Sequence, residues 1–176
     1  MFNIRKATKE DAAEIAKVHV DSWRTTYKNI VSDTYLAQLN YEDREKMWRD
    51  NSFESVFVAE DQSGIFGFAG FGPERTKKHN YDGELYAIYL FKEKQKMGAG
   101  KALVKEGVKY LLENGYQNML VWVLDENPSI GFYLSLEPEK VAKDSFTIAE
   151  KNHIEIAFGW RDLSLLEAKL SKKRII

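Results

Sequence analysis

The sequence predicts a mixed α/β fold in one domain that spans residues 1–176. Segments with strand-like alternation of apolar and polar residues are interspersed with segments whose apolar residues recur at helical spacing. A strand, a loop, a helix and a second strand follow one another over residues 84–124, which is typical of a βαβ unit with a parallel strand pair. The sequence contains no repeat, low-complexity tract or linker that would divide the chain.

The N-terminal third predicts one strand followed by three helices. Residues 2–8 alternate like a strand, and Thr8 with Asp11 has the pattern of a helix N-cap and its capping-box acid. Apolar residues then recur at helical spacing as far as residue 23. Two further helices are predicted over residues 32–39, where Ser32 is the expected cap, and over residues 41–49.

The middle of the chain predicts an antiparallel hairpin and a further strand. Residues 55–61 and 65–72 are strand-like and are joined by the turn QSG. Three glycines in the second of these strands predict a β-bulge or a close backbone approach. A polar loop over residues 73–83 then leads to a strand over residues 84–91.

The C-terminal half predicts two or three helices and two strands. A helix over residues 100–114 is expected to end at Gly115, and residues 117–124 are apolar on both faces, as in a central strand. Asn127 and Pro128 are the expected N-cap and first residue of a helix that continues over residues 129–136. A strand over residues 153–160 follows, and residues 164–173 are either a short amphipathic helix or a frayed tail.

Composition excludes several classes of function. The 26 basic and 27 acidic residues nearly cancel, so no strongly basic surface for nucleic acid is expected. The absence of cysteine excludes disulfides, thiolate metal sites and cysteine nucleophiles. His19, His79 and His153 lack zinc-ligand spacing, so no metal is expected. Because no signal peptide or long apolar run occurs, we expect a cytoplasmic protein without a membrane partner.

The loop before residue 100 is the main candidate for a binding site. Gly98, Gly100 and Lys101 lie where a strand gives way to a helix, and a helix N-terminus presents free N–H groups and a partial positive charge. The glycines would let an anion approach the backbone. The spacing fits neither G-x-x-x-x-G-K-[ST] nor G-x-G-x-x-G. These residues alone leave open both a phosphate site and an ordinary polar turn.

The hexapeptide QKMGAG at residues 95–100 fits the signature Q/R-x-x-G-x-G/A and resembles the loop of the GCN5-related N-acetyltransferases, the GNAT superfamily. Residues 122–133, WVLDENPSIGFY, are similar to the family's second signature but are one residue shorter between Asn127 and Phe132 than the common form. Residues 4–27 resemble the start of the family's domain. The resemblance implies a central, mostly antiparallel sheet with a splayed parallel strand pair and flanking helices.

The resemblance also implies acetyl-CoA as cosubstrate, with no metal. The loop would bind the pyrophosphate through its backbone amides, and the backbone of the preceding strand would pair with the pantetheine arm. The residues implied to bind acetyl-CoA are Ile88, Tyr89, Leu90, Gln95, Lys96, Met97, Gly98, Ala99, Gly100, Lys101 and Asn127.

Two residues are implied to be catalytic. Tyr133 occupies the family's position for a general acid that protonates the departing thiolate; a half-buried core tyrosine is the alternative. Glu84 precedes Gln95 by the same 11 residues as a glutamate base of this superfamily; a water chain and a solvated acid are the alternatives. By strand alternation, Glu84 is expected to share a face with Tyr86 and Ile88.

The acceptor site is expected among aromatic residues, namely Trp23, Tyr27 and Tyr86, although aromatic residues at such spacing are more often core. The predicted function is direct transfer of an acetyl group to a primary amine of a small molecule or peptide, in a ternary complex. A non-catalytic acyl-CoA sensor on the same fold is the alternative. A homodimer is compatible with the resemblance.

Overall fold

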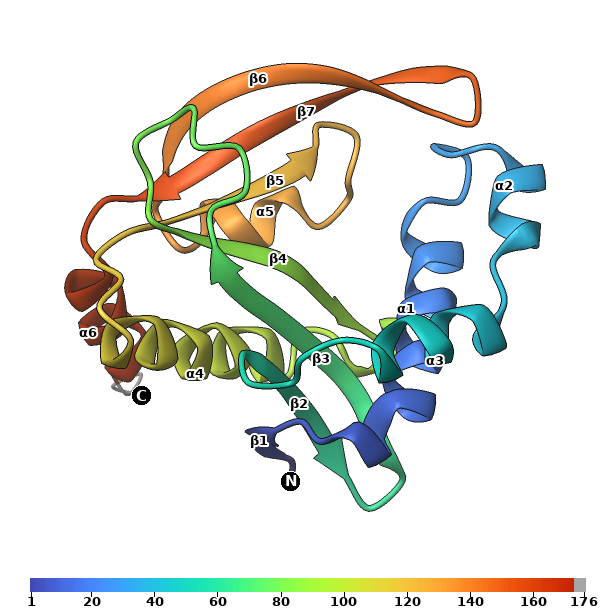
Figure 1. The fold of residues 1–176 in the computed structure, drawn as a ribbon, viewed down its shortest axis with the longest axis horizontal. Helices are drawn as coiled ribbons and strands as arrows, with labels where there is room; N and C mark the ends of the chain where they lie inside the picture. The colour runs from blue at the N-terminus through green and yellow to red at the C-terminus, as the bar shows by residue number, and fades with distance from the viewer. Residues whose placement is uncertain (173–176) are drawn as a thin grey trace.

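The computed structural model describes residues 1–172, which form one seven-stranded sheet in the order β1-β2-β3-β4-β5-β7-β6 with helices on both faces (Figure 1). The strands are β1 (Asn3–Lys6), β2 (Val56–Asp61), β3 (Gly64–Pro73), β4 (Gly83–Leu90), β5 (Met119–Leu124), β6 (Glu139–Ile148) and β7 (Lys151–Trp160). The helices are α1 (Ala12–Thr26), α2 (Asp33–Gln38), α3 (Tyr41–Arg49), α4 (Ala99–Glu113), α5 (Ile130–Leu134) and α6 (Leu163–Ser171), with short 3₁₀ turns at Lys9–Asp11 and Lys92–Lys94.

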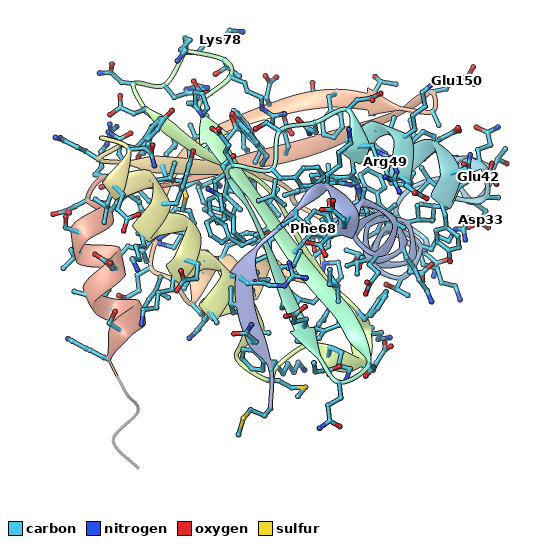
Figure 2. All side chains as sticks on the ribbon, turned by 60° about the horizontal axis from the view of Figure 1, so that its bottom comes forward. Asp33, Glu42, Arg49, Phe68, Lys78 and Glu150 are labelled. Carbon is cyan, nitrogen blue, oxygen red and sulfur yellow. The ribbon has the colours of Figure 1, made fainter. Side chains whose placement is uncertain are left out.

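The sheet is mixed and mostly antiparallel, as the family resemblance implied. Only β4 and β5 run parallel, and every other neighbouring pair is antiparallel. One apolar cluster lies between the sheet and α4, and another lies between the sheet, α1 and α3. Phe68 of β3 is fully buried in the second cluster, whereas charged residues such as Lys78 and Glu150 lie at the periphery (Figure 2). None of the described helices is long and apolar enough to cross a membrane.

Two of the local signals that predicted helix ends, Ser32 and Gly115, are confirmed. The Ser32 hydroxyl accepts a hydrogen bond from the Tyr35 amide at 3.2 Å, as an N-cap does. Gly115 has a φ of 85°, and the Tyr116 amide donates to the Leu111 carbonyl at 2.9 Å. This is the Schellman pattern, in which a left-handed residue ends a helix and satisfies its last carbonyl groups.

Two elements differ from the prediction. The sequence does not predict strand β6, because most of its side chains are exposed or half-exposed and the strand is defined by its pairing with β7. Helix α5 begins at Ile130 rather than at Pro128. Asn127 still accepts from the Ser129 amide at 2.8 Å, so it caps a turn that precedes the regular helix. The C-terminal segment is helical as α6; Lys173, at the end of the predicted range, lies outside the described residues.

The parallel strands β4 and β5 diverge soon after they meet. Their pairing covers only Gly83–Leu85 of β4 and Met119–Val121 of β5. Beyond these residues β4 pairs only with β3, and β5 pairs only with β7. The two strands therefore leave between them a gap that widens toward their carboxyl ends.

A β-bulge at Tyr86 changes which side chains share a face of β4. Gly70 of β3 pairs with Ala87 and Phe71 pairs with Leu85, so Tyr86 is the extra residue. Leu85 and Ile88 therefore both pack on the α4 side. The expectation that Glu84 and Ile88 share a face is wrong, because an inserted residue reverses the alternation beyond it.

Candidate active site

A cavity of about 1210 Å³ lies where β4 and β5 separate. Its walls come from the end of β4, the loop before α4, helix α5 with the turn before it, and helix α6. The residues predicted from the sequence that line it are Ile88, Tyr89, Leu90, Gln95, Lys96, Met97, Gly98, Gly100, Lys101, Asn127 and Tyr133. Ala99 is 1% exposed and does not line the cavity.

The start of α4 offers free amides to this cavity. The Ala102 amide donates to the Gly98 carbonyl at 3.1 Å, and this is the first hydrogen bond of the helix. Among residues 1–172, no backbone acceptor is paired with the amides of Ala99, Gly100 and Lys101. These amides are therefore available to a ligand, and the partial positive charge of the helix end favours an anion.

Gly98 makes this arrangement possible. Its φ is 89°, in the left-handed region that side chains rarely adopt, and a Cβ placed on it would meet no atom within 4 Å. The loop thus turns sharply at Gly98 and leaves open space beside its backbone. Gly100 has less space around it, because a Cβ added there would lie 3.1 Å from the Phe132 ring.

The charge of the cavity also favours an anion. Four lysines line it: Lys96, Lys101, Lys169 and Lys172. The only carboxylate among the described lining residues is that of Glu137, and the Lys169 ammonium pairs with it. Lys169 of α6 and Lys172 just after it are not predicted as site residues, since nothing in the sequence places that helix beside the loop.

Tyr133 projects into the cavity from α5 and is 7% exposed. Burial, and then the nearby Tyr27 hydroxyl, raise the pKa of the Tyr133 phenol above its ordinary value. The phenol is therefore protonated at neutral pH and can act as a proton donor. The sequence alone does not predict where the Tyr133 side chain points, because the spacing from Asn127 to Phe132 is one residue shorter than in the family's common signature.

Glu84 lies outside the cavity lining and is engaged elsewhere. It is 1% exposed, and its carboxylate accepts from the Arg75 amide and Nε, both at 3.1 Å, and from Nη2 at 2.5 Å. The Arg75 guanidinium also stacks 4.5 Å from the centre of the Tyr86 ring, and the Tyr86 hydroxyl donates to the Pro73 carbonyl. Glu84, Arg75 and Tyr86 thus hold the loop between β3 and β4.

Two of the three aromatic residues predicted for the acceptor side, Trp23 and Tyr27, belong to a cluster next to the cavity. Trp23 of α1 and Tyr27, the C-cap of that helix, pack with their ring centres 4.5 Å apart and join an apolar cluster that includes Leu124 at the end of β5. The Tyr27 hydroxyl lies 3.4 Å from the hydroxyl of Tyr89, which lines the cavity. Tyr86 is separate from this group because it contacts Arg75.

His19 is a packing residue of α1. Its Nδ1 accepts a hydrogen bond from the Trp48 indole at 3.2 Å, and its ring stacks on Tyr89 with centres 5.6 Å apart. Burial lowers the pKa of His19 to about 3, so the ring is neutral. Within residues 1–172, no group of three or more His, Cys, Asp or Glu side chains is placed to hold a metal ion.

Comparison with known proteins identifies the family. The model of the acetyltransferase (GNAT) family matches residues 13–136, and the chain belongs to this family. Over 173 residues it is 51% identical to the uncharacterized N-acetyltransferase YuaI of Bacillus subtilis (strain 168), covering 98% of this chain and 100% of that protein.

Solved structures share the fold at lower identity. The PaiA N-acetyltransferase of Thermoplasma acidophilum, in complex with coenzyme A, superposes with a TM-score of 0.71 at 22% identity, covering 89% of this chain and 98% of that one. YncA of Salmonella typhimurium, a putative acetyltransferase with its cofactor acetyl-CoA, has a TM-score of 0.68 at 19% identity, covering 91% and 93% of the two chains.

Proposed function

We propose that this protein transfers the acetyl group of acetyl-CoA directly to a primary amine of a small molecule or peptide within a ternary complex. The observation that carries the proposal is the set of free amides at the start of α4, beside a lysine-lined cavity between diverging strands. Related proteins of the same fold contain coenzyme A or acetyl-CoA, which agrees with this donor.

The cavity residues fit the parts of acetyl-CoA. The free amides and the lysines suit the pyrophosphate. Along Ile88–Leu90, β4 has no partner on its β5 side, so its backbone can pair with the amides of the pantetheine arm as with an added strand. This pairing would direct the thioester toward the gap where Tyr133 lies.

Tyr133 is the proposed general acid. When a neutral amine attacks the acetyl carbon and the carbon–sulfur bond breaks, the protonated phenol can donate its proton to the leaving sulfur. The proton that the acetylated nitrogen then loses can restore the phenol. No covalent enzyme intermediate is required, which agrees with a chain that lacks cysteine. The raised pKa of Tyr133 keeps this proton available throughout the neutral range.

Glu84 can serve as the base only if Arg75 releases its carboxylate, whereas a water chain requires no such movement. We expect Glu84→Gln to lower the free energy of unfolding by about 1–2 kcal/mol, because it weakens charge-assisted hydrogen bonds to a partly exposed arginine. Urea unfolding would measure this loss, with the exposed Glu113→Gln as control. Unchanged stability together with a large loss of turnover would contradict the anchoring role and favour Glu84 as base.

Binding and turnover together test the proposed function. Acetyl-CoA at about 100 times its Kd should stabilise the protein by about 2.7 kcal/mol, which thermal unfolding would detect. Release of free thiol should then depend on an added primary amine. Binding without turnover across a broad panel of amines would favour the acyl-CoA sensor, and no stabilisation by acetyl-CoA would contradict both functions.

A further inference from the structure

The sheet has a second face beside the gap, opposite the cavity. Val121 and Val123 of β5 and Ile156 of β7 pack in the α4 cluster, so their neighbours along each strand point to the other side. Leu124 and Glu155, which pair with each other across β5 and β7, share this second face. Leu124 packs there against α1 and α2, which cover that face.

Glu155 is a half-buried carboxylate without a partner. Within residues 1–172, no hydrogen bond or salt bridge is made by its side chain. Burial raises the pKa of Glu155 above its ordinary value, and the Asp144 carboxylate opposite it on β6 raises this pKa further. The charge of Arg75 lowers the pKa of Glu155, and that of Glu84 raises it. An unpaired carboxylate removed from water is costly, so this position favours a cation.

Other polar groups near this face also lack partners. Trp122 of β5 pairs with Ala157 of β7 and is therefore a diagonal neighbour of Glu155. The indole N–H of Trp122 is buried and has no hydrogen-bond acceptor. The indole N–H of Trp23, on α1, is likewise unpaired. His153, two residues before Glu155 and 2% exposed, makes no hydrogen bond with either ring nitrogen; the Glu126 carboxylate lies 3.6 Å from its Nδ1. Among the described residues, neither indole N–H has an acceptor and the His153 ring has no hydrogen-bond partner.

The register places Glu155 close to the gap. It pairs with Leu124, three residues beyond Val121, where the contact between β4 and β5 ends. Leu124 therefore has β7 on one side and the gap on the other. The cluster around Leu124 also includes Tyr89, which lines the cavity, so the second face and the cavity meet at this point.

We propose that Glu155 binds the ammonium group of the acceptor and removes its proton before acetyl transfer. This proposal rests on the proposed function and names its acceptor class: alkylammonium compounds with no carboxylate next to the amine. One N–H bond of the ammonium breaks as an O–H bond forms on Glu155, which leaves a neutral amine to attack. Asp144 adds negative charge that would repel a neighbouring carboxylate. The indole rings suit an alkylammonium group through cation–π contact.

Butylamine and norvaline form a matched pair of probes, since norvaline is butylamine with a carboxylate on the amine-bearing carbon. We expect the wild type to acetylate butylamine and to use norvaline at least about 10-fold less well in kcat/KM. Comparable use of the two compounds would overturn the proposed acceptor class.

Glu155→Gln tests the residue itself, with Glu150→Gln on the exposed tip of the same hairpin as control (Figure 2). Glu155→Gln should lower kcat/KM for butylamine by about 100-fold or more, because a general base contributes that much, and should leave acetyl-CoA affinity unchanged. The loss should shrink with 2,2,2-trifluoroethylamine, whose amine is largely neutral at pH 7 and needs no base to remove an ammonium proton before attack. An equal loss for both amines, or no loss, would overturn the base role.

A binding measurement separates this proposal from the proposed function. Calorimetric titration of butylamine into the CoA-loaded wild type should show binding that Glu155→Gln weakens about 10-fold or more. A protein that binds acetyl-CoA but not butylamine would overturn the assignment of Glu155 and leave the donor site standing. Failure to bind acetyl-CoA at all would overturn both.

Discussion

Gly98→Glu is expected to weaken acetyl-CoA binding by about 100-fold. The new side chain would enter the open space beside the free amides of α4 and bring a negative charge to the proposed pyrophosphate site. Loss of two charge-assisted hydrogen bonds costs about 3 kcal/mol, which corresponds to about 100-fold in Kd. Calorimetric titration of the folded variant with acetyl-CoA would measure the change.

Gly115→Glu provides a matched control. Gly115 lies at the other end of α4, has a φ of 85° against 89° at Gly98, and likewise has open space where a Cβ would lie. Both variants should lose roughly 1–2 kcal/mol of stability from the left-handed backbone. Only Gly98→Glu should lose affinity; an equal affinity for acetyl-CoA in the two variants would remove the loop from the binding site.

Tyr133→Phe is expected to lower kcat by about 10²–10⁴-fold while the Kd for acetyl-CoA changes by less than about 2-fold. The ring fills the same space in the cavity wall, so binding is preserved, but the proton donor is lost. Thiol release at saturating acetyl-CoA would measure the effect. Tyr110→Phe, which removes a hydroxyl from α4 away from the cavity lining, is the control.

The pH profile sharpens this prediction. Because burial raises the pKa of Tyr133 above its ordinary value near 10, the phenol stays protonated as the pH rises through 9. The wild type should therefore show no loss of kcat from Tyr133 between pH 7 and 9. A decline in this range that disappears in Tyr133→Phe would mean that the phenol ionises at its usual pKa or below and would contradict the buried proton donor.

Local physical rules explain why much of the fold and of the donor site was predictable. Ser32 caps α2 and Gly115 ends α4 through contacts with residues only a few positions away. Gly98 and the helix start that follows also depend on neighbours in sequence. The glycine loop was therefore predictable as a candidate anion site, since the amides, the turn and the charge lie within one short segment, whereas its choice over an ordinary polar turn depended on the resemblance to the family's signatures.

Other features depend on partners distant in sequence. Strand β6 exists because β7 pairs with it, although its own residues show little strand pattern. The bulge at Tyr86 arises from the register with β3, and it places Glu84 on the face opposite Ile88. Lys169 of α6 and Lys172 just after it join the cavity only because that helix packs beside α4.

The sequence by itself determined the mixed α/β class through the order of strand and helix patterns along the chain. It also determined most helix ends and the loop that presents free amides, because these depend on short-range backbone geometry. Only the tertiary structure decided that Glu84 is held by Arg75, that Tyr133 points into the cavity, and that Glu155 remains unpaired beside the gap. These positions depend on strand register and on burial. Both follow from the packing of segments far apart in the chain, which local patterns do not encode.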